Sequence, residues 1–423
     1  MVFIDLLLVL VIFIYLYSKK EISFLNPSFL FLIFHFFFVS VRAFQILLFD
    51  AKIIANYWYS DFVSVNEIEK ALIVSDITLL GFILGFNLLK KSFVLKGKKL
   101  NIFFSTYKDK KPKKIKFFEI LALILGIIGT FGYTILPGKI NDIDTIETNI
   151  FVTLITSFGV ISALMLIYLR GFKKIYLLYL FVILIIFSIQ GYHRYKVVLP
   201  LLFLMSYYLK LNNLKLPPLK YIMIGAFIFV FSFPLKQIGR SIQQNEQIDL
   251  VEIGLNSFNN LVEGESGDLS FLEQSAAMIG TMDKRQKVFY GETYVPILFF
   301  WVPRLYWKDK PKLNEWQHEI STAGRDYGQF GQISLLSGES YANFRFLGAF
   351  LIPFLVGRFY SKIYYSFKDI NYRHRGFLTL MLLNMILFQV WRDGIISLII
   401  FPLINYLPLV LLILIKKPEK KFK

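Results

Sequence analysis

The sequence predicts an all-α polytopic membrane protein, with about 11 transmembrane helices and one large loop outside the membrane. Three observations support this fold class. Hydrophobic residues make up 56% of the 423 residues and aromatic residues 18%, whereas soluble domains are roughly 45–50% apolar. The apolar residues gather in runs, several of them near the roughly 20 residues that cross a ~30 Å hydrocarbon core. Finally, the basic residues between the runs fall on one side of the predicted membrane.

The apolar runs give the order of the predicted spans. They lie at 2–17, 28–49, 70–89, 117–136, 150–169, 175–190, 196–210, 219–235, 344–363, 377–391 and 394–415. No basic segment precedes the first run and no small-residue cleavage site follows it, so we interpret it as a retained span. The chain then divides into N-terminal membrane helices over 1–235, an extracytoplasmic loop over 236–342, and C-terminal helices with a basic tail over 343–423.

Charge sets the predicted orientation. The net charge is +18, and eleven lysines but one aspartate lie between Lys90 and Lys116. This cluster and the other basic clusters fall on the same side of the spans, whereas the loops 50–69 and 141–147 are acidic. By the positive-inside rule the N-terminus lies outside, the C-terminus is cytoplasmic, and the loop between spans 8 and 9 faces outward. We interpret the lysine clusters as anchors that fix the topology and contact anionic lipid. The alternative is that they bind a cytoplasmic partner. No binding to nucleic acid is expected.

Within the predicted outer loop, 249–261 and 269–279 fit short helices. Residues 294–306 are apolar but broken by Pro296 and Pro303, and we expect them at the outer interface of the membrane. Residues 324–338 contain four glycines and predict a mobile loop or lid. The sequence has no cysteine, so disulfides and thiolate chemistry are excluded. No ligand spacing suggests a metal site and no nucleotide-binding motif occurs, so no cofactor is expected.

Arg42 and Asp76, two charged residues inside the predicted spans, form a hypothetical pair. In the second span, His35 and Arg42 are seven residues apart and so share a helical face. Asp76 lies at a similar depth to Arg42 in the next span. A charge at the bilayer centre costs about 2.5–3.5 kcal/mol, and an Arg42–Asp76 pair would reduce that cost. Such a pair is either structural or part of the rim of a substrate cavity, and His35 is interpreted as a packed polar residue.

The positive-inside rule explains basic residues on the cytoplasmic side, so the arginines on the predicted outer face need another explanation. They come from four separate regions of the chain and are Arg194, Arg240, Arg285, Arg304, Arg325 and Arg392. Guanidinium groups are planar and always charged, which suits phosphate oxygens. The set therefore predicts a site for a lipid pyrophosphate at headgroup level. The alternative is contact with ordinary phospholipid phosphates or with neighbouring carboxylates.

Three short motifs in order carry a resemblance to a known family. They are Gly191-Tyr192-His193-Arg194, then Trp301-Val-Pro-Arg304-Leu-Tyr-Trp307-Lys-Asp-Lys310-Pro311, then Gly338-Glu339-Ser-Tyr341-Ala-Asn343-Phe344. With the span count, the late outer loop and the Arg392-Asp393 turn, the chain resembles the Wzy-type oligosaccharide repeat-unit polymerases of bacterial O-antigen and capsule assembly. In that family a glycine commonly follows the Asn-Phe pair, where this chain has Arg345.

The resemblance implies a membrane glycosyltransferase of the GT-C type in the bacterial cytoplasmic membrane. It would transfer a growing glycan from polyprenyl pyrophosphate to the non-reducing end of a new lipid-linked repeat unit, without a nucleotide sugar. The implied partners are polyprenyl-pyrophosphate-linked oligosaccharides and membrane lipids, together with a chain-length regulator protein and a flippase. An O-antigen ligase, a lipid-linked oligosaccharide flippase and a structural or regulatory membrane protein are the alternatives.

The candidate catalytic bases are Glu339 first, His318 second and Asp393 third, because they are outward-facing proton acceptors in the predicted topology. Preorganised cations stabilise a departing pyrophosphate, which the outer arginines could do without a metal. Aromatic residues are candidate sugar platforms, and Trp307 is equally explained as an anchor at the interface. The full set of expected substrate-binding residues is Tyr192, Arg194, Arg240, Arg304, Trp307, Lys310, Arg325, Tyr341, Asn343 and Arg392, with Trp316 as a further platform.

Overall fold

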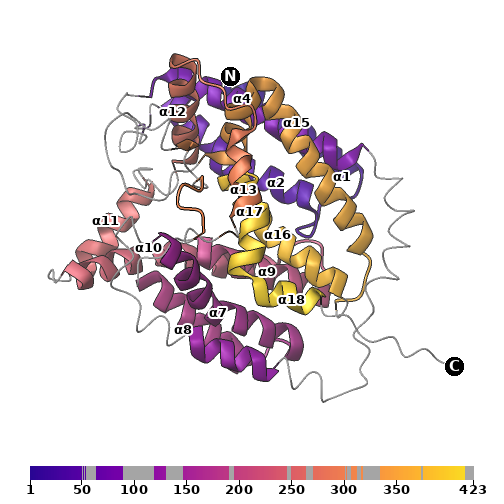
Figure 1. Ribbon diagram of the computed structural model, residues 1–423. Coiled ribbons are helices and arrows are strands. Elements are labelled where there is room, and N and C mark those ends of the chain that lie inside the picture. The colour runs from indigo at the N-terminus through magenta and orange to yellow at the C-terminus, as the bar shows by residue number, and fades with distance from the viewer. Residues whose placement is uncertain are drawn as a thin grey trace. The chain divides into compact units, whose positions relative to one another are not determined.

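In the computed structural model, every element of regular secondary structure in the described part of the chain is a helix (Figure 1). The described residues are 1–49, 51, 53, 63–88, 119–129, 146–189, 195–244, 249–262, 270–300, 302, 306–311, 316–317, 334–372 and 375–414. Within these ranges no β-strand occurs, which confirms the predicted all-α class.

The chain folds into two compact units, each built from separated parts of the sequence. The first comprises Met1–Lys90, Asp249–Lys362 and Ile386–Ile399, and the second comprises Lys91–Ile248, Ile363–Met385 and Ile400–Lys423. The predicted division of the chain into three consecutive parts is not tested by these contacts.

The first unit contains the helices that carry the ionisable residues discussed below. Its helices before the large loop are α1 (Val2–Ser18), α2 (Pro27–His35), the π-helix η1 (Phe36–Ser40), α3 (Val41–Phe49) and α4 (Val65–Asn87). From the loop onward it has α11 (Leu250–Val262), α12 (Phe271–Lys284), η4 (Glu292–Tyr294), α13 (Val295–Phe299), most of α15 (Leu335–Phe367), the end of α16 (Arg375–Asp393) and nearly all of α17 (Ile396–Ile400).

The second unit holds the helical stretch Glu119–Gly129. Its other helices are α7 (Ile146–Arg170), α8 (Lys174–Ile189), α9 (Tyr195–Leu211), α10 (Leu219–Gln244), the end of α15, the start of α16, the last residue of α17, the π-helix η5 (Phe401–Asn405) and α18 (Leu407–Leu414). Within it, α8 packs against both α7 and α10.

Local sequence explains where two helices of the first unit begin. The Asn26 side chain accepts a hydrogen bond from the Ser28 amide at 3.0 Å, and Pro27 occupies the first helical position of α2. At α4 the Ser64 side chain accepts from the Glu67 amide while the Glu67 side chain accepts from the Ser64 amide. Both arrangements satisfy backbone donors that a helix start would leave unpaired.

Glycines let α4 and α15 pack with their backbones in contact. A Cβ added at Gly81 or Gly85 would lie 2.4 Å or 2.0 Å from a carbonyl oxygen of α15, and one at Gly357 would lie 2.2 Å from a carbonyl of α4. The Thr78 hydroxyl donates to the Ala349 carbonyl at 3.0 Å across the same contact. This small-residue packing is typical of helices that associate within membranes.

Helix α15 is divided by a break at Phe344 and Arg345, where φ and ψ are −144° and 27°, then 53° and −143°. A positive φ favours glycine, and Arg345 occupies this conformation with its side chain held. Its guanidinium is 2.5 Å from Asp283 Oδ1, donates to the Lys287 carbonyl at 3.0 Å, and lies 5.2 Å from the centre of the Tyr341 ring. These contacts compensate for the backbone strain.

The helices follow the predicted apolar runs wherever the structure describes them. Two stretches, Pro27–Phe49 and Leu335–Phe367, are long and apolar enough to cross a membrane, and several shorter helices are apolar over 10–17 residues. The total of about 11 spans therefore stays a prediction. In the loop, α11 matches the expected 249–261 helix, whereas α12 runs to Lys284, beyond the expected 279.

Two helices extend well beyond the predicted membrane spans. Helix α10 continues to Gln244 rather than ending at 235, because its polar last turns follow Pro234 without a break. Helix α15 begins at Leu335 rather than 344, because the polar residues before the break are also helical. Hydropathy identifies only apolar segments, so it could not reveal the polar end of α10 or the polar start of α15.

Candidate functional site

The carboxylate of Glu339 forms the centre of the candidate site. Glu339 lies in the first turns of α15 and is fully buried, with 0% exposure. Its Oε2 accepts a hydrogen bond from the Ile395 amide at 2.7 Å. Its Oε1 is buried and has no hydrogen-bond partner within the described residues. One oxygen is thus held by the backbone, and the other keeps its acceptor capacity.

The turn between α16 and α17 is shaped to receive this carboxylate. Gly394 has φ +90°, and a Cβ at this position would lie 2.1 Å from Glu339 Oε2. Any side chain would therefore be strained and would also displace the carboxylate. The turn requires glycine for both reasons.

Asp393 and Arg392 precede this glycine, so a second predicted base comes close to the first. The Asp393 carboxylate accepts from the Gln389 side chain and lies 3.5 Å from the Arg392 guanidinium. It is also near enough to Glu339 to act on it electrostatically. Arg392 additionally lies 6.0 Å from the centre of the Phe271 ring, a cation–π contact. The structure therefore brings Glu339, Asp393 and Arg392 together at one turn.

Asn343 holds the loop segment before α13 against the same helical turns. Its side-chain nitrogen donates to Thr293 Oγ1 at 2.8 Å and to the Glu339 carbonyl at 2.9 Å, while its side-chain oxygen accepts from the Gly291 amide at 2.9 Å. The Tyr290 amide donates to the Asn343 carbonyl at 3.1 Å. Since Asn343 is completely buried, its observed role is to position the backbone around Glu339.

Tyr294 adds a phenol to this environment. Burial raises the pKa of the Tyr294 phenol, and the Glu339 carboxylate raises it further. The phenol therefore keeps its proton at neutral pH, and it can donate a hydrogen bond but cannot act as a base.

The other predicted binding residues in the described part are engaged within the protein. Tyr341 is 2% exposed, and its hydroxyl donates to Asp283 Oδ1 at 2.8 Å. Lys310 donates to the Val302 carbonyl at 2.8 Å. Trp307 is 37% exposed and packs edge-on against Phe299, with ring centres 5.2 Å apart. Trp316 is buried against Phe289. Of the two tryptophans, only Trp307 presents a surface on which a sugar could stack.

Several predicted residues lie outside the described residues, so their convergence is not tested. These are Tyr192, Arg194, Arg304, His318 and Arg325. Arg240 lies in the backbone of α10, but its side chain is not described. The proposed arginine clamp around a pyrophosphate stays a prediction.

The predicted Arg42–Asp76 pair is wrong. Arg42 instead forms an ion pair with Glu273 of α12, at 2.6 Å, and Asp76 lies 3.3 Å from His35. The reason is η1, a turn of π-helix between His35 and Arg42. A π-helical turn closes its hydrogen bonds over five residues instead of four, so Arg42 does not keep the face expected for a regular helix.

Sequence reasoning also missed four polar residues, Asp5, Glu273, Asp283 and Tyr294. Asp5 and Glu273 are fully buried, whereas Asp283 is 28% exposed and Tyr294 is half-buried with a buried hydroxyl. Asp5 had a usable signal, because an ionisable residue within an apolar span marks a functional site by default. Glu273, Asp283 and Tyr294 lie in the polar loop, where an acid or a tyrosine has nothing to distinguish it before its partners are known.

A comparison of the whole chain with protein-family models, with curated proteins and with solved structures finds no match.

Proposed function

We propose that this protein is a membrane glycosyltransferase that polymerises lipid-linked oligosaccharide repeat units on the outer face of the bacterial cytoplasmic membrane. The observation that supports it most is the buried Glu339 carboxylate, with one oxygen fixed by the Ile395 amide and the other without a partner in the described chain. A general base needs a fixed position and an acceptor atom facing its substrate proton.

In the proposed reaction, Glu339 accepts the proton of a hydroxyl at the non-reducing end of a lipid-linked repeat unit. The hydroxyl oxygen forms a bond to the anomeric carbon of the growing glycan, and the bond from that carbon to the pyrophosphate of the polyprenyl carrier breaks. The negative charge of the leaving pyrophosphate needs preorganised cations. Arg392, which lies beside Asp393 at the same turn as Glu339, is one such cation.

The fold we propose around this site is GT-C-like, with about 11 spans and the 236–342 loop outside. The two helices long and apolar enough to cross a membrane are compatible with it. In this arrangement the other outer arginines, Arg194, Arg240, Arg304 and Arg325, complete the binding of the pyrophosphate. No nucleotide sugar or metal takes part in the transfer.

The test is complementation of a deletion strain, with the surface glycan examined on a gel. Deletion should leave single-repeat products in place of a ladder. Glu339→Gln removes the base and keeps the shape of the side chain, and general-base catalysis contributes about 10²–10⁴-fold in rate, so the ladder should stay absent. Glu252→Gln makes the same chemical change on an exposed position of α11 and should restore a normal ladder.

Other outcomes separate the alternatives. Free polymer on its lipid carrier after deletion would indicate a ligase, and loss of all surface repeats would indicate a flippase. A normal ladder from Glu339→Gln at wild-type protein levels would reject Glu339 as the base. Normal ladders from both Arg194→Ala and Arg304→Ala would reject the phosphate clamp.

A further inference from the structure

The first unit contains a second group of ionisable side chains that the proposed transfer does not use. Asp5 of α1, His35 of α2 and Asp76 of α4 meet where these three helices pack. His35 Nε2 lies 2.9 Å from Asp5 Oδ1 and 3.3 Å from Asp76 Oδ1. One ligand atom from each residue lies within 4.8 Å of the others. The three residues are far apart in sequence, which is why their spacing gave no sign of a site.

The group lies deep in the helices, and its net charge depends on the protons or the cation that it holds. The side chains of Asp5 and His35 are 0% and 2% exposed, and that of Asp76 is 13% exposed. At 1.5 Å per residue, Asp76 lies about 16 Å from either end of α4. Two ionised carboxylates and a neutral imidazole carry a charge of minus two. One divalent cation would bring that sum to zero, which is favourable where burial penalises net charge.

One acceptor atom in the group is left without a hydrogen bond. Asp5 Oδ2 is buried and has no hydrogen-bond partner among the described residues, whereas Asp76 Oδ1 is buried with His35 Nε2 at 3.3 Å. Leaving such an atom unsatisfied costs about 1–3 kcal/mol, and more for a charged group. Asp5 Oδ1, in contrast, accepts from the Ser40 hydroxyl at 3.1 Å. Ser40 therefore orients one carboxylate while the remaining oxygens stay available as ligands.

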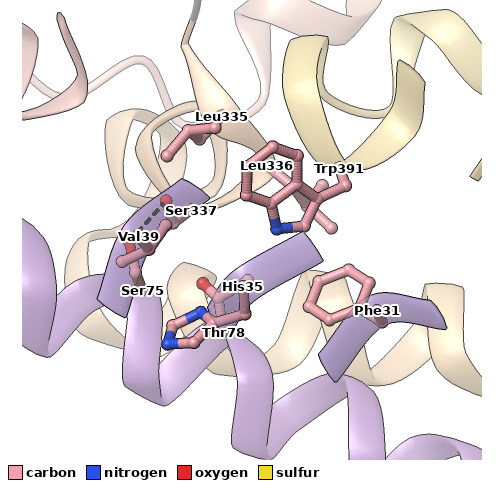
Figure 2. Close-up of a pocket in the computed structure, with 9 residues that line it drawn as sticks. All are labelled: Phe31, His35, Val39, Ser75, Thr78, Leu335, Leu336, Ser337 and Trp391. Carbon is pink, nitrogen blue, oxygen red and sulfur yellow. Dashed lines mark hydrogen bonds between the residues drawn. The ribbon is translucent and has the colours of Figure 1, made fainter. Parts of the chain in front are cut away.

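A small cavity borders the imidazole (Figure 2). It is lined by Phe31 and Trp391 and, on its polar side, by Ser75 and Ser337, whose hydroxyls hydrogen-bond at 3.1 Å. Its volume of about 10 Å³ is close to the space needed for one water molecule. A histidine that binds a metal commonly donates its second ring N–H to water or to a carbonyl, and this cavity has room for a water molecule beside His35.

We propose that Asp5, His35 and Asp76 bind a divalent transition-metal cation of the zinc class. Zinc binds imidazole nitrogen and carboxylate oxygen at roughly 2.0–2.2 Å, which places neighbouring ligand atoms of a tetrahedral site about 3.3 Å apart. The 3.3 Å separation between His35 Nε2 and Asp76 Oδ1 matches that spacing, and the 2.9 Å separation from Asp5 Oδ1 would lengthen slightly when the cation is bound. The cation would be coordinated by one residue from each of α1, α2 and α4, and it would fix α1 to its two neighbours.

Metal content tests the site directly. The full chain, purified in detergent with a tag that lacks histidine, should contain about one equivalent of zinc per chain by elemental analysis. Asp5→Asn, His35→Gln and Asp76→Asn should each lose that zinc. Asp309→Asn, an exposed position in the loop, should retain it. Equal zinc in all four variants, or a wild-type chain that neither contains zinc nor takes it up, would overturn the proposal.

A second measurement covers variants that fail to fold. Wild-type protein treated with a chelator should take up Co²⁺ and show the visible absorption of a site with nitrogen and oxygen ligands. Chelation should also lower the Tm of the wild type and leave the Tm of Asp76→Asn unchanged. Ser40→Ala removes only the hydrogen bond to Asp5, so it should weaken Co²⁺ binding about 10–100-fold. No absorption from a folded, chelator-treated wild type would show that the group holds a proton instead of a metal.

Discussion

Replacing Arg42 with methionine should leave a buried carboxylate without its principal counter-charge. Arg42 Nε and NH2 lie 2.7 Å and 2.6 Å from Glu273 Oε1, and the two side chains are 7% and 0% exposed. Breaking one side of a buried ion pair costs about 3–5 kcal/mol, because the remaining charge stays desolvated. We expect Arg42→Met to lower the free energy of unfolding by that amount.

The pH dependence of the variant follows from the same carboxyl group. Burial raises the pKa of Glu273, and Arg42 opposes that rise, so the substitution should raise the pKa further. A carboxyl with a higher pKa in the folded than in the unfolded chain binds its proton more tightly when folded, and stability then rises as the pH falls. Between the raised pKa of the folded chain and the unfolded value of about 4.3, the free energy of unfolding should increase by up to about 1.4 kcal/mol for each unit by which the pH falls.

The assay is reversible unfolding of the full chain in detergent at several pH values. Arg285→Met, an exposed arginine just beyond α12, is the matched control and should change stability by no more than about 0.5 kcal/mol. Arg42→Met combined with Glu273→Leu removes both charges and should recover most of the loss. The reasoning would be refuted if Arg42→Met were as stable as Arg285→Met. It would also be refuted if the double variant were no more stable than Arg42→Met alone.

Five further substitutions test four backbone positions. Gly394→Ala should push Glu339 from its place and abolish the glycan ladder at normal protein levels, and an intact ladder would show that the turn tolerates a side chain. Gly85→Ala should cost about 1–3 kcal/mol by overpacking, measured by unfolding, whereas Gly225→Ala, with nothing within 4 Å of the added Cβ, should cost nothing or slightly stabilise. Arg345→Gly should stay within about 1 kcal/mol of wild type, because relief of strain offsets the lost contacts. Arg345→Ala loses the same contacts but keeps the backbone strain, so it should be less stable than Arg345→Gly. Equal free energies of unfolding for the two variants would show that the backbone at this position is not strained.

The sequence predicted helices well because apolar runs alone identify them. The predicted run at 28–49 corresponds to α2, η1 and α3, which together span Pro27–Phe49. Hydropathy could not reveal the π-helical turn inside this run, and that turn decides which neighbours His35 and Arg42 reach. The wrong Arg42–Asp76 pair follows from assuming regular helical geometry across it.

The candidate site could be predicted in part. Glu339 and Asp393 were named from their chemistry, and the structure brings them together, but the sequence held no sign that the Ile395 amide would fix the carboxylate. Asp283 was missed because its partners, Tyr341 and Arg345, come from a helix that begins before the apolar run. Long-range pairings of this kind depend on tertiary packing, which local patterns do not encode.

The break in α15 also has a mechanical consequence. The short arm before the break carries Glu339 and is fastened to the loop through Asn343, whereas the long arm beyond it is fastened to α4 through close glycine contacts. Bilayers of different thickness change the tilt of a long apolar helix, and here that tilt would act on the long arm. The break at Arg345 separates the two arms, so we expect a change in the tilt of the long arm to leave the Glu339 carboxylate in its place at the Gly394 turn.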